Sequence, residues 1–526
     1  MKRVIVLILL SYLSTANFAD KVAAAQNPAA QNPAAQNPAT QNPAAQNPAA
    51  QNPAAQNPAT QNPAAQNPAA QNPATQNPAA QNPAAIKPNI VMIMIDDLGW
   101  MDLACQGNKL VETPNIDRFA GQGMRFTSNY SAAPVCSPTR AAVMTGMAPA
   151  RLHLTTHIPD RFFPNDDRPM SAKTLDYLPL EHTTIAERFS EAGYATAFFG
   201  KWHLSGNGGK GGVGQSEFEP QHQGFDINVG GCCYGGPPSF FSPYRIHNLP
   251  DGKEGEYLPD RLADEAIDFM RAKREQPFMI FLWNYTVHWP MQAPETLLKK
   301  YESRKGPGLN DTRYGAMIEA MDTSIGRVLD ELDKLKLADN TLVVFTSDNG
   351  GFSGVADNRP LRESKGHLYE GGIRVPMIAR WPGRIPAGKV NDTPVVSTDL
   401  YPTFLAAANL DATKNHPLDG ENILPVLQAS GDLKRSSIFF HYPNYAWHMS
   451  NRLGSAVRSG QWKLLEWFDD GSVELYNLKD DLSETKNVAD NHPAIAKRLQ
   501  AELHQWRKSV NANMPTHKTK DDKNSK

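Results

Sequence analysis

The sequence has few cysteines for its length. Only four occur in 526 residues: Cys105, Cys136, Cys232 and Cys233. An exported chain of this size that depended on disulfides would need a denser set of cysteines. We therefore expect the fold to be stabilised mainly by its hydrophobic core.

The sequence also lacks an excess of charge of either sign. Lysine and arginine together number 52, against 54 aspartates and glutamates, so the formal net charge is −2. No general basic field is available to hold nucleic acid, and we predict no nucleic-acid partner. Any site for an anion must be built from local groups.

Long apolar runs are missing as well. Residues 1–25, MKRVIVLILLSYLSTANFADKVAAA, combine two basic residues, a short apolar run and small residues at the end. This is the layout of a signal peptide, and the run is too short to span a membrane. No later segment has roughly 18 uninterrupted apolar residues. We expect a soluble mature chain without a transmembrane segment that is periplasmic, secreted or associated with the cell surface.

Residues 26–85 repeat the pentad QNPAA, with QNPAT at some positions. Proline at every fifth position and the near absence of large apolar residues predict a disordered spacer. As a flexible coil it would reach roughly 45 Å. A β-solenoid is the alternative, but its coils need large inward-facing apolar residues.

The rest of the chain alternates apolar runs with helical patterns. Residues 86–430 predict an α/β catalytic domain with a large mixed, mostly parallel sheet flanked by helices. Its expected strands are 90–95, 195–199, 278–283 and 341–346, and its expected helices are 116–122, 185–192 and 313–335. Residues 431–510 predict a smaller antiparallel sheet, with strands SAVRSG, WKLLEW and VELYNL, followed by a helix at 493–509. Residues 511–526 are expected to form a charged, flexible tail.

Polar residues follow two of these strands as pairs, Asp96-Asp97 and Asp348-Asn349. Ligands of open α/β sheets gather at the carboxyl ends of the strands. Three carboxylates and an amide form an all-oxygen set that suits calcium or magnesium. The alternative is that both pairs are turn and cap residues.

Two other strands are followed by basic residues. Lys201 and His203 come after residues 195–199, and His288 comes shortly after 278–283. Such groups can bind an oxyanion and transfer a proton, although buried structural histidines are common. Lys365 lies in the glycine-rich loop ESKGHLYEGG, whose backbone could approach a ligand closely. The alternative is an ordinary surface loop.

The segment CSPTRAAVMTG, residues 136–146, is a stronger indication. Ser137 can cap a helix that begins at Pro138, which would place Cys136 at the positive end of the helix. Arg140 lies one turn into the helix and can reach back toward the same point. A buried structural cysteine is the alternative.

These motifs together resemble those of the formylglycine-dependent type I sulfatases of the alkaline-phosphatase superfamily. The resemblance runs from about Pro88 to Ala489. It rests on C-x-P-x-R and on PNIVMIMIDDLGW, TPNIDRFAGQGMRF, GYATAFFGKWHL, TVHWP, TSDNGG, KGHLYEGGIRVP and ELYNLKDDLSETKNVA, which occur in the family's order.

The resemblance implies a role for each of these positions. Cys136 would be oxidised to formylglycine by a formylglycine-generating or sulfatase-maturating enzyme, and one hydroxyl of its hydrate would attack sulfur. One calcium ion would be held by Asp96, Asp97, modified Cys136, Asp348 and Asn349. Arg140 and His203 would stabilise and deprotonate the hydrate, Lys201 and Lys365 would bind sulfate oxygens, and His288 would protonate the leaving oxygen.

One loop departs from the family pattern. After Gly224-Phe225-Asp226, many sulfatases have a serine that contacts the sulfate, whereas this chain reads INVGGCCYGG. Cys232 and Cys233 are interpreted as a strained disulfide, two thiols or packing residues.

We expect an exported sulfatase that hydrolyses sulfate esters of a carbohydrate, with aryl sulfates as the alternative substrates. The loops 151–169 and 442–454 contain aromatic, histidine and charged residues that suit a sugar pocket. A phosphodiester or phosphonate ester hydrolase of the same superfamily is one alternative. A non-catalytic protein that binds sulfated glycans is another.

Overall fold

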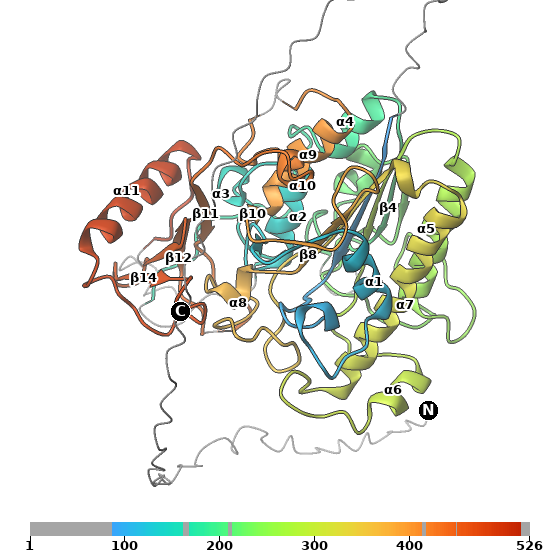
Figure 1. The fold of residues 1–526 in the computed structure, drawn as a ribbon, viewed down its shortest axis with the longest axis horizontal. Coiled ribbons are helices and arrows are strands. Elements are labelled where there is room, and N and C mark those ends of the chain that lie inside the picture. The colour runs from blue at the N-terminus through green and yellow to red at the C-terminus, as the bar shows by residue number, and fades with distance from the viewer. Residues whose placement is uncertain (1–86, 161–167, 209–212, 413–416, 449, 517–526) are drawn as a thin grey trace, which may run out of the picture. The chain divides into compact units, whose positions relative to one another are not determined.

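The computed structural model describes residues 87–516 except 161–167, 209–212, 413–416 and 449 (Figure 1). The expected signal peptide and the repeat spacer lie outside the described residues. So do residues 517–526 of the expected tail. Among the described residues, no helix is both long enough and apolar enough to cross a bilayer.

An eight-stranded sheet forms the centre of the fold, in the order β5-β4-β6-β1-β7-β8-β2-β9. Four adjacent strands are buried along their whole length: β1 (Asn89–Ile95), β4 (Ala195–Gly200), β6 (Phe278–Trp283) and β7 (Thr341–Ser347). These four strands are parallel to one another. The other strands are β2 (Met124–Phe126), β5 (Ile227–Val229), β8 (Met377–Arg380) and β9 (Lys389–Asn391). Of the eight, only β8 runs antiparallel to its neighbours. The expected mixed, mostly parallel sheet is confirmed.

Helices cover both faces of this sheet, and β1 shows why. Its alternate residues Val91, Ile93 and Ile95 pack into one core, and Ile90, Met92 and Met94 pack into the other. The first core is closed by α1 (Pro114–Gln122), α5 (Leu258–Lys273) and α7 (Thr312–Lys334), with α6 (Glu295–Tyr301) packed against α7. The second core is closed by α2 (Cys136–Thr145), α3 (Pro149–Leu152), α4 (Ile185–Glu191), α9 (Leu400–Ala407) and α10 (Leu424–Leu427).

The C-terminal part forms its own antiparallel sheet, as expected (Figure 1). Its strands, in spatial order, are β11 (Ser437–Tyr442), β12 (Gly454–Ser459), β13 (Trp462–Trp467) and β14 (Val473–Asn477). Helix α11 (Pro493–Ser509) packs Leu499 and Leu503 against this sheet. Residues 511–516 are ordered against the fold, because Thr516 forms a β-bridge with Met170.

The two sheets meet at a set of buried charged residues that we call the junction cluster: Glu370, Arg374, Arg458, Lys463 and Glu484. Lys463 Nζ lies 2.9 Å from Glu370 Oε1 and 2.8 Å from Glu484 Oε1, and all three side chains are fully buried. Glu370 belongs to the short helix α8 (Glu370–Ile373), which leads into β8. A two-stranded sheet of β3 (Asn129–Tyr130) and β10 (Val395–Val396) lies beside this cluster, and Tyr130 donates a hydrogen bond to Glu370 Oε2.

Candidate active site

Four adjacent strands, β4, β6, β1 and β7, bring the predicted residues to one edge of the sheet. Because these strands are parallel, the residues that follow their carboxyl ends converge. Seven predicted residues arrive in this way: Asp96, Asp97, Lys201, His203, His288, Asp348 and Asn349. The other three, Cys136, Arg140 and Lys365, come from α2 and from the loop before α8.

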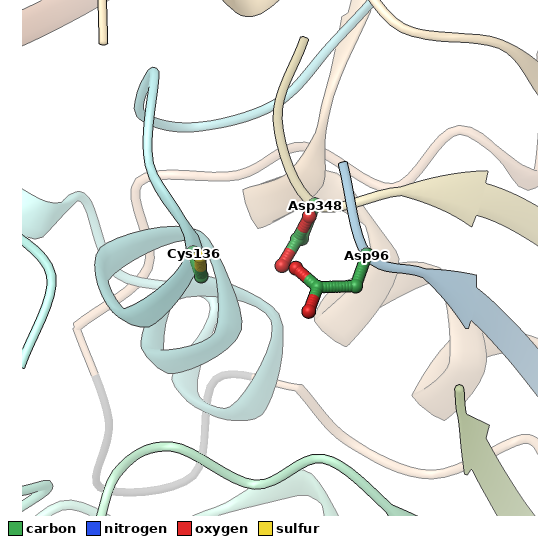
Figure 2. A group of neighbouring side chains, drawn as sticks. All are labelled: Asp96, Cys136 and Asp348. Atoms are coloured by element: carbon green, nitrogen blue, oxygen red, sulfur yellow. The ribbon is translucent and has the colours of Figure 1, made fainter. Parts of the chain in front are cut away.

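Cys136 lies at the start of α2, close to two of the carboxylates. Ligand atoms of Asp96, Cys136 and Asp348 lie within 4.8 Å of one another. Figure 2 shows the carboxylates of Asp96 and Asp348 facing each other beside the first turn of α2. Three potential ligands therefore meet at a single buried point.

The expected helix start is wrong by two residues. Helix α2 begins at Cys136 rather than Pro138, and its N-cap Val135 makes no side-chain capping bond. Ser137 is not the cap, because its hydroxyl donates to the backbone oxygen of His203 at 3.0 Å and accepts from Ile158 N. The Ser137 hydroxyl, which was predicted to cap the helix, instead makes a tertiary contact with His203.

Arg140 connects three parts of the site. Its Nε and Nη2 lie 3.0 and 2.7 Å from Asp348 Oδ2. Its Nη1 donates to the backbone oxygen of Lys201 at 2.5 Å. The guanidinium group is fully buried, so Arg140 fixes Asp348 relative to the end of β4.

Two lysines pair with the aspartates of β1. Lys201 Nζ lies 2.7 Å from Asp96 Oδ2, and Lys365 Nζ lies 2.6 Å from Asp97 Oδ1. We call Asp96, Asp97, Arg140, Lys201, Asp348, Asn349 and Lys365 the site cluster. It holds three carboxylates and three basic groups, so its formal charges balance.

Two oxygen atoms of the site cluster have no hydrogen-bond donor. Asp96 Oδ1 and Asn349 Oδ1 are buried without a hydrogen-bond partner. The amide nitrogen of Asn349 donates to Asp97 Oδ1 at 2.7 Å, which leaves the amide oxygen available to a ligand. Buried oxygens without donors are costly, and carboxylate and amide oxygens are the ligands that hard divalent cations prefer. The residues therefore fit a bound calcium or magnesium ion.

The same burial shifts the pKa values of the acidic groups. Burial raises the pKa of Asp96 to about 8, against the lowering effect of Lys201. Burial would also raise the pKa of Asp97, but the positive charge of Lys365 holds it well below its usual range.

Burial also shifts the pKa values of the Cys136 thiol and of the two histidines, His203 and His288. It raises the pKa of the Cys136 thiol to about 11, more than the nearby lysines lower it, so the thiol is protonated at neutral pH. A protonated thiol is a poor nucleophile. Burial lowers the pKa of His288 to about 3, and it lowers the pKa of His203 well below the usual range. Both rings are therefore neutral in the ligand-free protein.

A cavity of about 540 Å³ opens above this cluster. Its lining includes four of the predicted residues: Cys136, His203, His288 and Lys365. The other six predicted residues are buried behind this lining. Both loops expected to form a sugar pocket contribute, through His157 and Trp447. No aspartate or glutamate lines the described cavity.

The loop with the adjacent cysteines forms part of the same wall. Cys233, Tyr234, Gly235 and Gly236 line the cavity, and Cys232 is buried next to them. All four cysteines of the chain carry thiols, so Cys232 and Cys233 are not joined by a disulfide.

The two glycines of this loop contact the two histidines. A Cβ on Gly235 would lie 2.8 Å from His203 Cε1, and a Cβ on Gly236 would lie 2.6 Å from His288 Nδ1. Neither distance leaves room for a side chain, so the loop backbone packs closely against both rings. Sequence reasoning missed this contact, as it missed Trp289 and Phe352 of the lining.

Two family models match the chain. The model described as Sulfatase matches residues 88–410, and the model described as N-sulphoglucosamine sulphohydrolase, C-terminal, matches residues 363–509.

Individual proteins are similar over most of the chain. A sulfatase of Formosa agariphila is 31% identical, over 82% of this chain and 90% of that protein. The N-acetylgalactosamine-6-sulfatase of Homo sapiens is 34% identical, over 67% of this chain and 68% of that protein. The chain in the crystal structure of Ps i-CgsB in complex with k-i-k-neocarrahexaose is 31% identical in sequence, with a TM-score of 0.70. The match covers 83% of this chain and 96% of the Ps i-CgsB chain.

Proposed function

Because this chain belongs to the sulfatase family and is a sulfuric ester hydrolase, we propose that it cleaves sulfate esters of a carbohydrate. The observation that carries the proposal is the meeting of Cys136, Asp96 and Asp348 within 4.8 Å at the base of a cavity. The cavity walls support a sugar substrate, because they combine aromatic rings with histidines. Two similar proteins are also named for, or bound to, sugars.

We infer that a calcium ion is held by Asp96, Asp97, Asp348, Asn349 and the modified Cys136. The unpartnered oxygens Asp96 Oδ1 and Asn349 Oδ1 support this set. Bound there, the ion would supply electrostatic stabilisation of a sulfate oxygen. Since the formal charges of the site cluster balance, a divalent cation would leave the site positive, which favours an anionic substrate.

The nucleophile of the proposal is a formylglycine made from Cys136 by a maturation enzyme. Its hydrated aldehyde would supply the attacking hydroxyl, a role that the protonated Cys136 thiol is poorly suited to perform. Arg140 and His203 would orient and deprotonate this group, since both contact the residues around it.

The remaining residues would act on the substrate. Lys365 lines the cavity and would bind sulfate oxygens. Lys201 would also act on the sulfate; it is buried behind the cavity lining, where it pairs with Asp96. His288 would protonate the leaving oxygen from its imidazolium form: Nδ1 lies 3.0 Å from Trp289 O, so the proton to be transferred would be held on Nε2. We further propose that the enzyme is exported, and that residues 26–85 hold it away from a surface.

The test compares wild-type protein with Cys136→Ala and with Cys105→Ala as the matched control. Turnover of an aryl sulfate and of its matched aryl phosphate is measured, together with the mass of the peptide that contains Cys136. We expect sulfate hydrolysis in the wild type and in Cys105→Ala, an aldehyde at position 136, and loss of turnover in Cys136→Ala. Full activity in Cys136→Ala, or faster turnover of the phosphate ester, would refute the proposal.

A further inference from the structure

Two exposed tryptophans lie at the active-site cavity. All nine tryptophans of the chain are among the described residues, and seven are buried or half-buried. The other two, Trp289 and Trp447, are 42% and 38% exposed, and both line the cavity that contains Cys136. Single exposed apolar residues need no explanation, but two large aromatic rings exposed in one cavity indicate a binding surface.

Trp447 lies in the loop between β11 and β12 and contacts the proposed sulfate-binding lysine. Its ring is stacked with Phe352 at a centroid distance of 5.7 Å and an interplanar angle of 24°. Lys365 Nζ lies 5.0 Å from the centre of the Trp447 ring. His157 meets the same ring edge-on at 6.0 Å. The indole is therefore held in place while more than a third of its surface stays open.

Trp289 comes from a different segment, directly after His288. The Arg313 guanidinium group lies 5.8 Å from the centre of its ring, and Asp311 fixes that guanidinium group through contacts down to 2.6 Å. The backbone oxygen of Trp289 accepts from His288 Nδ1. The backbone of Trp289 thus contacts His288, the proposed leaving-group acid, and the ring of Trp447 contacts Lys365, which is proposed to bind sulfate.

We propose that Trp289 and Trp447 are stacking platforms for two sugar rings, so that the substrate is a sulfated oligosaccharide rather than a sulfated monosaccharide. This inference rests on the proposed function. The apolar faces of sugar rings stack on aromatic side chains, whose bodies are apolar and whose nitrogen can bond to a hydroxyl. A cavity of about 540 Å³ lies within the range of pockets that enclose ligands of drug size, so it has room for more than one ring.

The test uses the full chain and two series of defined sulfated saccharides of increasing length, one from a sulfated galactan and one from a glycosaminoglycan. Steady-state kcat and KM are measured for wild type, Trp289→Leu, Trp289→Phe, Trp447→Leu and Trp447→Phe. Trp462→Leu is the control, since this half-buried ring packs on His492 in the C-terminal part and does not line the cavity. Leucine keeps apolar volume but removes the flat ring, and phenylalanine keeps the ring.

In the wild type we expect kcat/KM to rise about tenfold or more from the single sugar to the longer saccharides of the series that is cleaved. The leucine variants should lose this rise, mainly through KM, and the phenylalanine variants should keep most of it. Leucine variants that retain the preference for longer saccharides would overturn the inference, as would a wild type that cleaves an aryl sulfate but no saccharide of either series. A wild type that cleaves no sulfate ester at all would instead refute the proposed function.

Discussion

The site cluster and the junction cluster are both groups of buried charges, but they differ in how closely their oxygen atoms are paired with cations. In the junction cluster, Lys463 contacts two glutamates, and Glu370 also accepts hydrogen bonds from Tyr130 and Arg374. Both clusters contain buried atoms without a hydrogen-bond partner: Arg458 Nε and Glu484 Oε1 in the junction cluster, and Asp96 Oδ1 and Asn349 Oδ1 in the site cluster. Glu484 Oε1 lies 2.8 Å from Lys463 Nζ, whereas Asp96 Oδ1 lies 3.9 Å from Arg140 Nη2. Buried charges thus join two sheets in the junction cluster, and in the site cluster they surround the proposed cation. The two clusters should respond differently to substitution.

The largest effect is expected from Asp96→Asn, which keeps the shape of the side chain and removes its charge. Turnover of a sulfate ester should fall about a thousandfold, because a ligand of the proposed cation loses its charge. The calcium-dependent rise in melting temperature should also be lost, and differential scanning fluorimetry with and without a chelator measures it. If the variant binds calcium as the wild type does, Asp96 is not a ligand.

Lys463→Met should break the junction cluster and leave the site intact. Removing the lysine leaves Glu370 and Glu484 buried without their main partner, which is expected to cost about 3–5 kcal/mol of unfolding free energy. Denaturant unfolding measures this loss. The kcat of the folded fraction should match the wild type. A large loss of kcat at full folding would mean that the junction cluster also supports the site.

Gly236→Ala should disturb the position of His288 in the active site without removing a charge from either cluster. The new Cβ would lie 2.6 Å from His288 Nδ1 and 2.8 Å from Trp289 O, so the ring must move. We expect kcat/KM for a sulfate ester to fall about ten- to a hundredfold. Gly121→Ala is the control, because nothing lies within 4 Å of its added Cβ. Equal activity of the two variants would show that the loop is not needed to position His288.

The smallest effect is expected for Glu484→Gln at acid pH. Burial raises the pKa of Glu484 to about 7, against the lowering effect of Lys463. The folded state therefore holds a proton that the unfolded state releases above its ordinary pKa of 4.5, so this group stabilises the fold at low pH and loses that contribution as pH rises toward 7.

At pH 5 we expect the variant to lie within about 1 kcal/mol of wild type, since both side chains are neutral. Relative to the variant, the unfolding free energy of the wild type should fall between pH 5 and pH 7.5. Parallel pH profiles of the two proteins would contradict the raised pKa.

Half of the strands of the large sheet are predictable from the sequence, because β1, β4, β6 and β7 are apolar and buried along their whole length. The strand predicted at 278–283 matches β6, and the helix predicted at 313–335 matches α7 to within one residue at each end. The shorter strands β2, β5, β8 and β9 of the large sheet and the strand β11 of the small sheet were not predicted. The same logic finds the candidate site, since residues that follow adjacent parallel strands must converge.

The features that could not be predicted depend on tertiary contacts. Ser137 reads as a cap, but its hydroxyl bonds to His203, which is distant in sequence. The approach of Gly235 and Gly236 to the histidines depends on how one loop packs on two strand ends. Likewise, the pairing of Lys463 with Glu370 requires both sheets to be in place.

The ion pairs of the site cluster join residues that are far apart along the chain, and this has a consequence for folding. Lys201 and Asp96 are separated by 105 positions, Arg140 and Asp348 by 208, and Lys365 and Asp97 by 268. Contacts between distant segments form late, because a long loop must close before they are gained. In refolding experiments, sulfate-ester hydrolysis should therefore return after the helical signal, and enzyme activity would report completion of the whole sheet rather than its beginning.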